Sequence, residues 1–208
     1  MPISTLSRMS VPLEGQNSGQ GLLHPKLKYR FRVIFENFGK NAPTTELTKQ
    51  VVTCTRPSLE HDQITIDVYN SRIFLVGKHT WQPIEIVVRD DAPGAVQLAV
   101  GEQLQRQVDH YNQSSAVAGE DYKFTTRLQI LDGGNGAYAP TSLEEWTLVG
   151  CYIGNSNFND LSYAESDVVT ISMSLQYDNA IHTPIGSGVG ADVGRSSGTM
   201  VTGVNGSP

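Results

Sequence analysis

The sequence predicts a mainly β protein of the antiparallel α+β class, with one amphipathic helix between two runs of strands. Segments in which apolar and polar residues alternate recur along most of the chain, and this is the period of a half-buried strand. One central segment has the helical period instead. Runs of strands on both sides of one helix favour an antiparallel sheet over repeated βαβ units. The composition agrees, because 20 glycines and 10 prolines among 208 residues are typical of a chain with many turns.

Five segments before the helix have the strand pattern. The clearest is LKYRFRVIFE (27–36), in which every second residue is apolar and the other face is mostly charged. A second strand in TKQVVTCTRP (48–57) ends at its proline, which cannot donate to a ladder. Two strands then form a hairpin over about residues 57–77, with the turn at Asn70–Ser71. The last strand contains the apolar residues of IEIVV (84–88).

A helix is predicted from Pro93 to about Asn112. Its apolar residues fall on one stripe at 100° per residue, as expected for a helix with one buried face. They are Val96, Val100, Leu104, Val108 and Tyr111. Asp91 is a credible N-cap, and Pro93 is tolerated in the first turn because its missing N–H has no helical partner there. Capping is therefore a better interpretation of the Asp90–Asp91 pair than a general acid and base.

Three strands follow the helix: YKFTTRLQIL, EEWTLVGCYIG and SDVVTISMSLQY. A Gly-rich turn, DGGNG, joins the first two, and Glu144 and Glu145 at the start of the second are expected to be solvated. The last strand has one apolar face. Its other face is polar but carries no charge, unlike the usual solvent face of a sheet. That uncharged face consists of Val168, Thr170, Ser172, Ser174 and Gln176.

The sequence contains no recognisable pattern of catalytic or ligand-binding residues. The five histidines show no metal-ligand spacing, and no cysteine cluster accompanies them. The stretches DGGNGAY and GSGVGADVG lack the flanking strand and helix that a phosphate-binding loop requires. Cys54 and Cys151 lie in predicted strands and are expected to be reduced, packed thiols. We therefore expect a protein that is not an enzyme and that uses no metal and no cofactor.

Composition divides the chain into an N-terminal arm (1–23), a β domain (24–182) and a Gly/Ser-rich C-terminal arm (183–208). The first residues lack the apolar core of a secretory signal, and no stretch approaches the roughly twenty apolar residues of a membrane helix. The cytoplasm is the expected compartment. A net charge of −6 argues against tight binding of nucleic acid, because an acidic protein repels DNA.

Four stretches occur in a distinctive order: HPKLKYRFRVIFE, KHTWQPIEIVVRDD running into VGEQLQRQVDHYN, EEWTLVGCYIGNSNFNDLSYAESD, and VVTISMSLQYDNA. Together they resemble the tail tube proteins of contractile-tailed bacteriophages (myoviruses of the T-even type). More distantly they are similar to the tube proteins of type VI secretion. The third stretch resembles the family's Trp-x-Leu-x-Gly strand. The similarity spans about residues 24–182. The two arms depart from shorter family members, and their role is open between inter-ring clasps, sheath contacts and decoration.

The resemblance implies an antiparallel β-sandwich or barrel with one flanking α-helix, assembled into hexameric rings. In such rings the inner sheets join into a continuous β-wall around a channel. The rings stack into a tube inside a contractile sheath, and DNA passes through as a passenger without specific binding. The implied partners are further copies of the chain, the sheath, a baseplate or tube initiator and a tape-measure protein. The implied location is a virion tail assembled in the host cytoplasm.

Two sets of site residues follow from these interpretations. The uncharged face of the last strand is predicted to line the channel, because it offers no cation with which phosphates could pair. Its residues are Thr170, Ser172, Ser174 and Gln176. Apolar residues of the 57–77 hairpin are predicted to anchor subunits to one another. They are Ile64, Ile66, Val68, Phe74 and Leu75. Ordinary packing within one sandwich is the alternative for both sets.

Two alternatives to a phage tail tube subunit remain. A baseplate or tube-initiator protein, or the tube of a secretion-type system, would share the fold but differ in its arms and stacking faces. A monomeric β-sandwich that binds a small ligand or carbohydrate belongs to another class. Exposed aromatic residues on loops would favour it, whereas Trp81 and Trp146 lie within predicted strands and are expected in the core.

Overall fold

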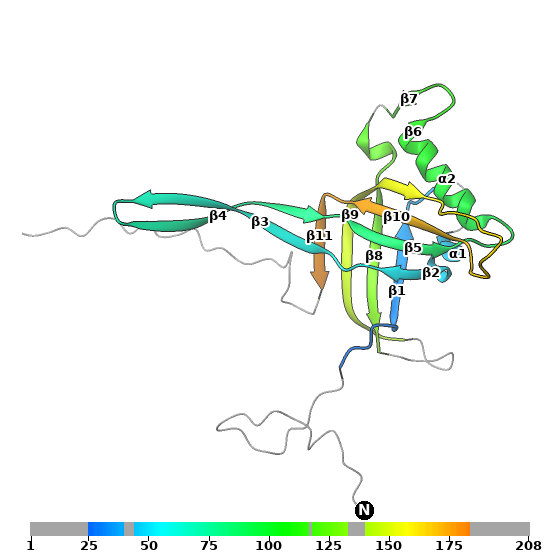
Figure 1. Ribbon diagram of the computed structural model, residues 1–208, viewed down its shortest axis with the longest axis horizontal. Helices are drawn as coiled ribbons and strands as arrows, with labels where there is room; N and C mark the ends of the chain where they lie inside the picture. Colours follow the sequence, from blue (N-terminus) through cyan, green and yellow to red (C-terminus); the bar gives the residue numbers. More distant parts are fainter. Residues whose placement is uncertain (1–24, 40–43, 117, 133–139, 184–208) are drawn as a thin grey trace, which may run out of the picture.

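The computed structural model describes residues 25–39, 44–116, 118–132 and 140–183, and every structural statement below concerns these residues (Figure 1). Nearly all of both predicted arms, 1–23 and 183–208, therefore lies outside the described residues. Within the described part, the chain forms a mainly β domain from which one long hairpin projects (Figure 1).

The domain consists of two antiparallel layers that share one long strand. Sheet A contains β1 (Phe31–Glu36), β8 (Phe124–Leu131), the first part of β9 (Ser142–Asn157) and β11 (Asn179–Thr183). Sheet B contains the last part of β9, β10 (Thr170–Gln176), β5 (Ile84–Arg89) and β2 (Val51–Cys54). Strands of the two layers run across one another (Figure 1). The predicted antiparallel arrangement with a flanking helix is confirmed.

The alternating pattern of the sequence places one face of each layer in a common core. Ile84, Ile86 and Val88 of β5 are fully buried, and the intervening residues of that strand are more exposed. In β10 the apolar residues are likewise buried and the polar residues are half-buried. Sheet A adds Val33, Phe35, Phe124, Leu128 and Leu148. Burial of each such side chain contributes roughly 1.5–3 kcal/mol, so this core is the main stabilising feature of the domain.

Helix α2 (Ala95–Gln107) packs against the core through Val96, Ala99 and Val100. The Asp91 carboxylate accepts a hydrogen bond from the Val96 N–H (3.0 Å), so it caps the helix as predicted. The N-cap position itself belongs to Gly94. The predicted C-terminal end near Asn112 is wrong.

Directly after α2 the backbone adopts an extended conformation. Val108 and Asp109 form the short strand β6 (Val108–Asp109), which pairs with β7 (Ser114–Ser115). Val108 and Tyr111 are consequently exposed rather than part of the buried stripe. A single turn of 3-10 helix, η2 (Gly119–Asp121), leads on to sheet A.

Two further short elements were not predicted. Helix α1 (Thr44–Lys49) replaces the start of the expected second strand and buries Leu47. Strand β11 pairs with β9 next to the position where the described chain ends. Both are short, six and five residues, and neither shows a clear period in the sequence.

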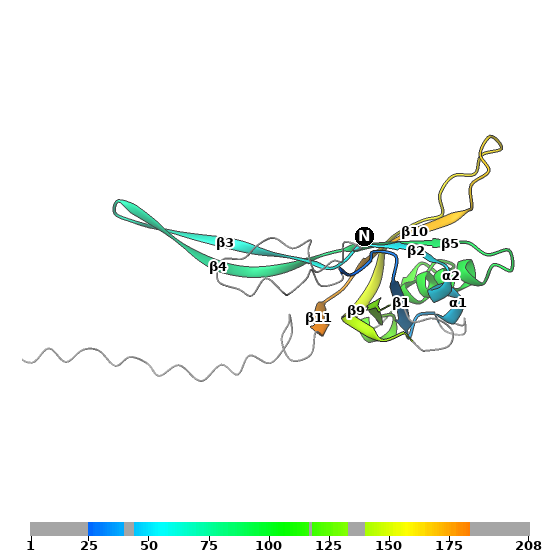
Figure 2. The same ribbon diagram turned by 90° about the horizontal axis from the view of Figure 1, so that it is seen from below.

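The predicted hairpin is longer than expected. It consists of β3 (Ser58–Val68) and β4 (Ser71–Gln82), with Tyr69 and Asn70 in the turn. It continues from β2 and β5 and projects far beyond the domain (Figures 1 and 2). At its base, Leu59 and Trp81 face one another and pack against the core. The rest of the hairpin has no such support from the domain.

Candidate assembly surfaces

The outer face of sheet B carries the uncharged residues of β10. Antiparallel partners lie on the same face, so Ser172 sits between Asn157 of β9 and Val87 of β5. Ser174 sits between Asn155 and Glu85. The strand pairing thus identifies residues of this face that the sequence of β10 alone could not reveal. Besides amides and hydroxyls, the face contains a carboxylate and, opposite Thr170, the guanidinium of Arg89.

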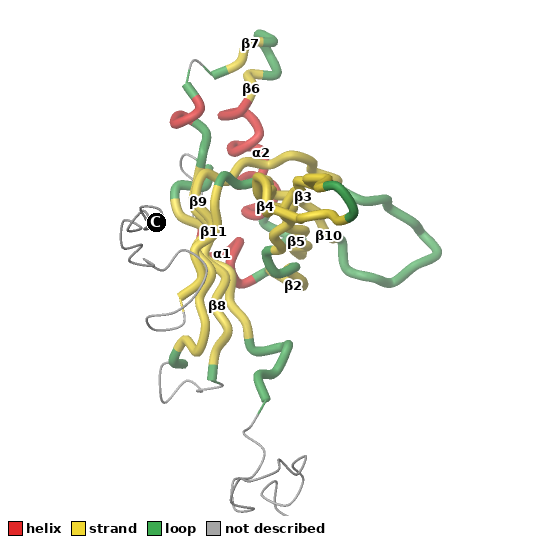
Figure 3. Tube along the Cα trace, turned by 90° about the vertical axis from the view of Figure 1, so that its left-hand side faces the viewer, coloured by secondary structure: helices red, strands yellow, loops and turns green. Residues whose placement is uncertain are grey.

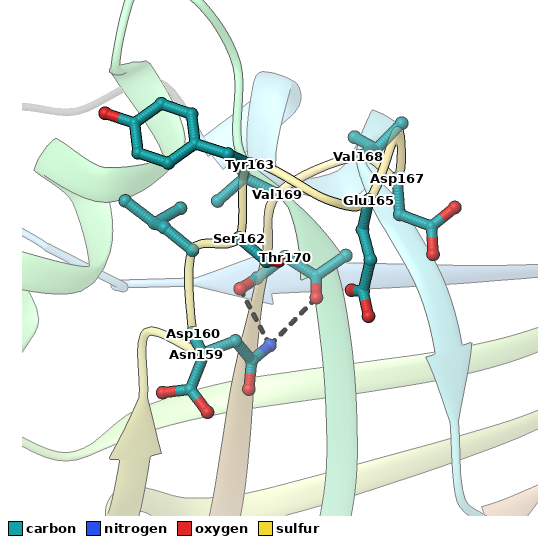
Figure 4. A pocket seen from close by; sticks show the side chains of 10 residues that line it. Asn159, Asp160, Ser162, Tyr163, Glu165, Asp167, Val168, Val169 and Thr170 are labelled. Atoms are coloured by element: carbon teal, nitrogen blue, oxygen red, sulfur yellow. Dashed lines mark hydrogen bonds between the residues drawn. The ribbon is translucent and has the colours of Figure 1, made fainter.

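Part of this polar face is held by the loop that joins β9 to β10. The Asn159 side-chain amide donates to the Thr170 carbonyl and to its hydroxyl, both at 2.8 Å (Figure 4). It also donates, more weakly, to the Ser172 hydroxyl (3.3 Å). The loop encloses a hollow of about 440 Å³ lined mainly by its own residues. Asp160, Glu165 and Asp167 give it an acidic character. The loop stands out on the side of sheet B turned away from sheet A (Figures 2 and 3).

The β3–β4 hairpin has two different faces. Its register pairs Ile64 with Leu75 and Ile66 with Ile73, so these four side chains and Val68 form one apolar face. Phe74 lies opposite Thr65 and belongs to the other face. Of the five predicted anchors, the structure therefore brings four together. Ile73 completes the apolar face and was missed, because the partner of Ile66 depends on the pairing register.

The apolar residues of the hairpin are exposed in the single chain. Seven of them keep between 43% and 76% of their surface accessible. They are Ile64, Ile66, Val68, Ile73, Phe74, Leu75 and Val76. An isolated hairpin with so much exposed apolar surface is unusual for a monomeric protein, and such surfaces mark interaction sites. The alternative of ordinary core is excluded for a single chain, whereas a role as subunit anchors stays a prediction.

Sheet B has two open edges. No described strand pairs with the outer side of β2 or with the outer side of β9 beyond Cys151. At the β9 edge the side chain of Gln107 bonds both backbone groups of Ile153, donating to its carbonyl (2.9 Å) and accepting from its N–H (2.8 Å). The amide thus occupies the place of a neighbouring strand. At the β2 edge a groove of about 810 Å³ opens over sheet A, with Phe31, Val52 and Leu128 in its lining.

A buried carboxylate holds the base of the hairpin. Glu144 of β9 is only 4% exposed, contrary to the expectation that it is solvated, and it bonds Lys26, Arg56 and the Trp146 indole. Burial alone would raise its pKa, but the bonds from Lys26 and Trp146 and the charges of Arg56 and Lys26 outweigh this and lower the pKa to about 2. Arg56 lies two residues before β3, so this cluster ties the start of the hairpin to β9.

Replacement of Glu144 by glutamine is expected to lower the free energy of unfolding at pH 7 by about 2 kcal/mol, because the cations lose their buried counter-charge. The pKa of Glu144 is depressed in the folded chain, so its contribution is present above its ordinary value of 4.5 and is lost as the pH falls toward 2. The difference between wild type and variant should shrink over that range. Urea denaturation at several pH values measures it. Glu46→Gln, which removes an exposed pair with Lys49, is the control and should cost less than about 0.5 kcal/mol.

The described residues contain no group of three or more potential ligands placed to hold a metal ion. The carboxylate of Asp90 accepts from the Asp91 N–H, so both residues of the pair take part in local capping.

Both cysteines are free thiols, as predicted. Burial raises the pKa of Cys54 to about 12 and that of Cys151 to about 11, which makes them poor nucleophiles. Across the described chain, no helix has the length and apolarity needed to cross a bilayer.

The fold is similar to those of several solved components of contractile injection machines. A chain of the tube-terminating cap of the anti-feeding prophage superimposes with a TM-score of 0.54 at 11% identity, over 79% of this chain and 94% of that one. A chain of the sheath/tube terminator of the extracellular contractile injection system PVC has a TM-score of 0.53 at 17% identity, over 79% and 100%. A chain of the PVC sheath–tube complex has a TM-score of 0.52 at 16% identity, over 78% and 93%.

No protein-family model and no curated protein matches the sequence. The similarity is therefore one of structure. At identities of 11–17% it establishes the fold, a mainly β fold of the kind found in tube-type proteins of contractile machines.

Proposed function

We propose that this chain is the tube subunit of a contractile tail, in which hexameric rings stack into a hollow conduit. The observation that carries the proposal is sheet B, a four-stranded layer with two open edges and a polar outer face. The similarity to chains from tube-containing machines supports the same interpretation. The protein is then structural rather than enzymatic.

The strand directions of sheet B favour closure into a ring. Strand direction alternates from β9 through β10 and β5 to β2, so the two edge strands run in opposite directions. Rotation about an axis roughly along the strands leaves these directions unchanged. The β2 edge of one copy then meets the β9 edge of the next in an antiparallel pair, which leaves no exposed edge. The incoming strand would also cover the groove beside β2.

In such a ring the outer face of sheet B lines the channel. Thr170, Ser172, Ser174 and Gln176 make this lining wettable without adding a net positive charge that would retain DNA. Glu85 and Arg89, one of each sign, add no net charge to the strands of this face. DNA passes as a passenger. The hairpin, with its apolar face, joins one ring to the next, and the sheath, baseplate and tape-measure protein are the further partners in the virion tail.

A second candidate function is that of a terminator or initiator at one end of the tube. Two of the similar chains come from tube-terminating assemblies. A ring of such a protein would bind a neighbouring ring on only one of its two sides. A secretion-type tube, which delivers protein rather than DNA, would have the same subunit architecture as a phage tube.

Electron microscopy of the purified, untagged chain, together with light scattering, tests the proposal. We expect rings or hollow filaments with masses in multiples of six subunits. Single rings that never lengthen would favour the terminator. A chain that remains monomeric at high concentration, even with baseplate components added, would overturn the tube function.

The channel face can be tested by adding charge to it. The double variant Ser172→Lys, Ser174→Lys should still assemble, but its tubes should retain double-stranded DNA at low salt and release it as the salt concentration rises. Wild-type tubes should not retain DNA. Fluorescently labelled DNA co-sedimented with preformed tubes provides the measurement, and ejection by the complete particle should be slower. If the variant fails to assemble, the face packs against protein and does not line the channel.

A further inference from the structure

The apex of the hairpin carries a tyrosine in an unfavourable backbone conformation. Tyr69 has a φ of 40°, a left-handed conformation that turns of this kind usually assign to glycine or asparagine. Its side chain is fully exposed, at 101% of the reference surface. The single chain thus gains no burial that would offset the strain. Such outliers are characteristic of functional positions, and exposed tyrosines are frequent anchors of protein interfaces.

A hollow of matching character lies on helix α2. It has a volume of about 460 Å³ and is lined by Gly94, Gln97, Leu98, Gly101, Glu102 and Phe158. Leu98 and Phe158 are large apolar side chains that stay exposed. Gly101 lies in the middle of the helix, where glycine costs about 1 kcal/mol relative to alanine.

The structure shows no packing reason for glycine at position 101. A Cβ atom added there would meet nothing within 4 Å. Gly101 therefore does not make room for another part of the same chain. Its missing side chain instead leaves a hollow at the surface. An apolar depression of this kind suits the side chain of a partner.

The hairpin apex and the hollow lie at opposite ends of the molecule. In Figure 1 the hairpin extends to the left, whereas the start of α2 and the β9–β10 loop lie at the right. Contacts between opposite ends of identical chains are head-to-tail, and they propagate along one direction. Charge does not oppose this pairing. The loop beside the hollow carries Asp160, Glu165 and Asp167, whereas the apical segment 64–76 is neutral, because its Arg72 guanidinium pairs with Asp67 (2.7 Å).

We infer that Tyr69 of one copy docks into the hollow formed by Leu98, Gly101 and Phe158 of a copy in the adjacent ring. The inference rests on the proposed tube function and names the receiving surface for the hairpin. It also gives the chain two adhesive ends, which a repeating subunit needs and a terminator does not.

Two variants and two controls test the docking in the full-length chain. Tyr69→Ser removes the anchor, and Gly101→Leu fills the hollow. Each should leave rings intact by native mass spectrometry but raise the critical concentration for tubes more than tenfold by sedimentation and microscopy. Tyr111→Ser removes an equally exposed tyrosine outside both surfaces, and Gly101→Ala adds only a methyl group. Both controls should form tubes as the wild type does.

Cross-linking identifies the partner surface directly. Under mild oxidation, a chain with Asn70→Cys and Gln97→Cys should form disulfide-linked ladders once tubes are present, whereas the pair Asn70→Cys and Tyr111→Cys should not. Normal tubes from Gly101→Leu, or ladders from the second cysteine pair, would overturn the docking while leaving the tube function intact. Loss of tubes in Gly101→Leu without ladders from the first pair would mean that another segment occupies the hollow. A wild-type chain that forms no rings would instead refute the tube function itself.

Discussion

Replacement of Gly150 by alanine will lower the free energy of unfolding by about 3 kcal/mol. Gly150 has a φ of 71°, a left-handed conformation that costs a residue with a Cβ roughly 1–2 kcal/mol. An added Cβ would also overlap the Asp178 Oδ2 atom and lie 2.7 Å from its Cγ. Asp178 must then move, which disturbs its ion pair with Lys123 (2.6 Å). Gly150 ends the Trp-x-Leu-x-Gly stretch, and these two constraints supply a physical reason for glycine there.

Gly154→Ala on the same strand is the matched control. Its added Cβ would meet the Ser174 carbonyl at 3.6 Å, an ordinary contact, so the cost should stay below about 1 kcal/mol. Chemical denaturation of both variants provides the comparison. The double variant Gly150→Ala, Asp178→Ala separates the contact from the backbone strain by a double-mutant cycle. A Gly150→Ala protein as stable as the control would show that the chain around β9 relaxes at little cost.

The double substitution Ile66→Asp, Ile73→Asp should abolish tubes while leaving the fold intact. The two side chains lie opposite one another on the apolar face of the hairpin, and both are about half exposed in the single chain. Their further burial in a stack would contribute about 1 kcal/mol each, so two per copy in six copies amounts to about 12 kcal/mol for each ring added. Carboxylates at both positions convert this gain into a desolvation penalty.

Gln63→Asp with Thr65→Asp is the matched control, because it adds the same charge to the opposite face of the same hairpin. We expect it to form tubes. Circular dichroism and thermal unfolding should be close to wild type for both proteins, since the hairpin lies outside the core. Sedimentation and electron microscopy report stacking. Equal loss of tubes in both variants would show that the apolar face has no special role.

Regular elements with a strong period could be predicted from the sequence. The alternation in β1, β5 and β10 and the helical period of α2 correctly gave their types and their buried faces. The end of α2 was misplaced because Val108 and Tyr111 continue the apolar period beyond the last helical residue. Helix α1 was missed because it lies directly before strand β2. It has one buried residue, Leu47, and a single apolar residue gives no helical period.

The assembly surfaces could be predicted only in part, since they depend on pairing between distant segments. The exposed hairpin was recognisable from its alternating isoleucines. Which side chains share its apolar face, however, depends on the pairing register of β3 and β4. Glu144 appeared to be one of two ordinary acidic residues at the start of a strand. Its burial depends on Lys26 and Arg56, which are 118 and 88 residues away in the sequence. The Gln107 contact with Ile153 likewise joins a helix and a strand that no local pattern connects.

That contact has a kinetic consequence. If the β9 edge pairs with β2 of another copy, the two hydrogen bonds that Gln107 makes to Ile153 must first be exchanged for backbone bonds. Each of these hydrogen bonds contributes about 1 kcal/mol. Pairing between two copies is therefore less favourable than pairing between two strand edges without such bonds. Newly made chains then remain dispersed until a preformed template presents several contacts together. Polymerisation would show a lag that seeds abolish, so growth begins at the time and place that the seed determines.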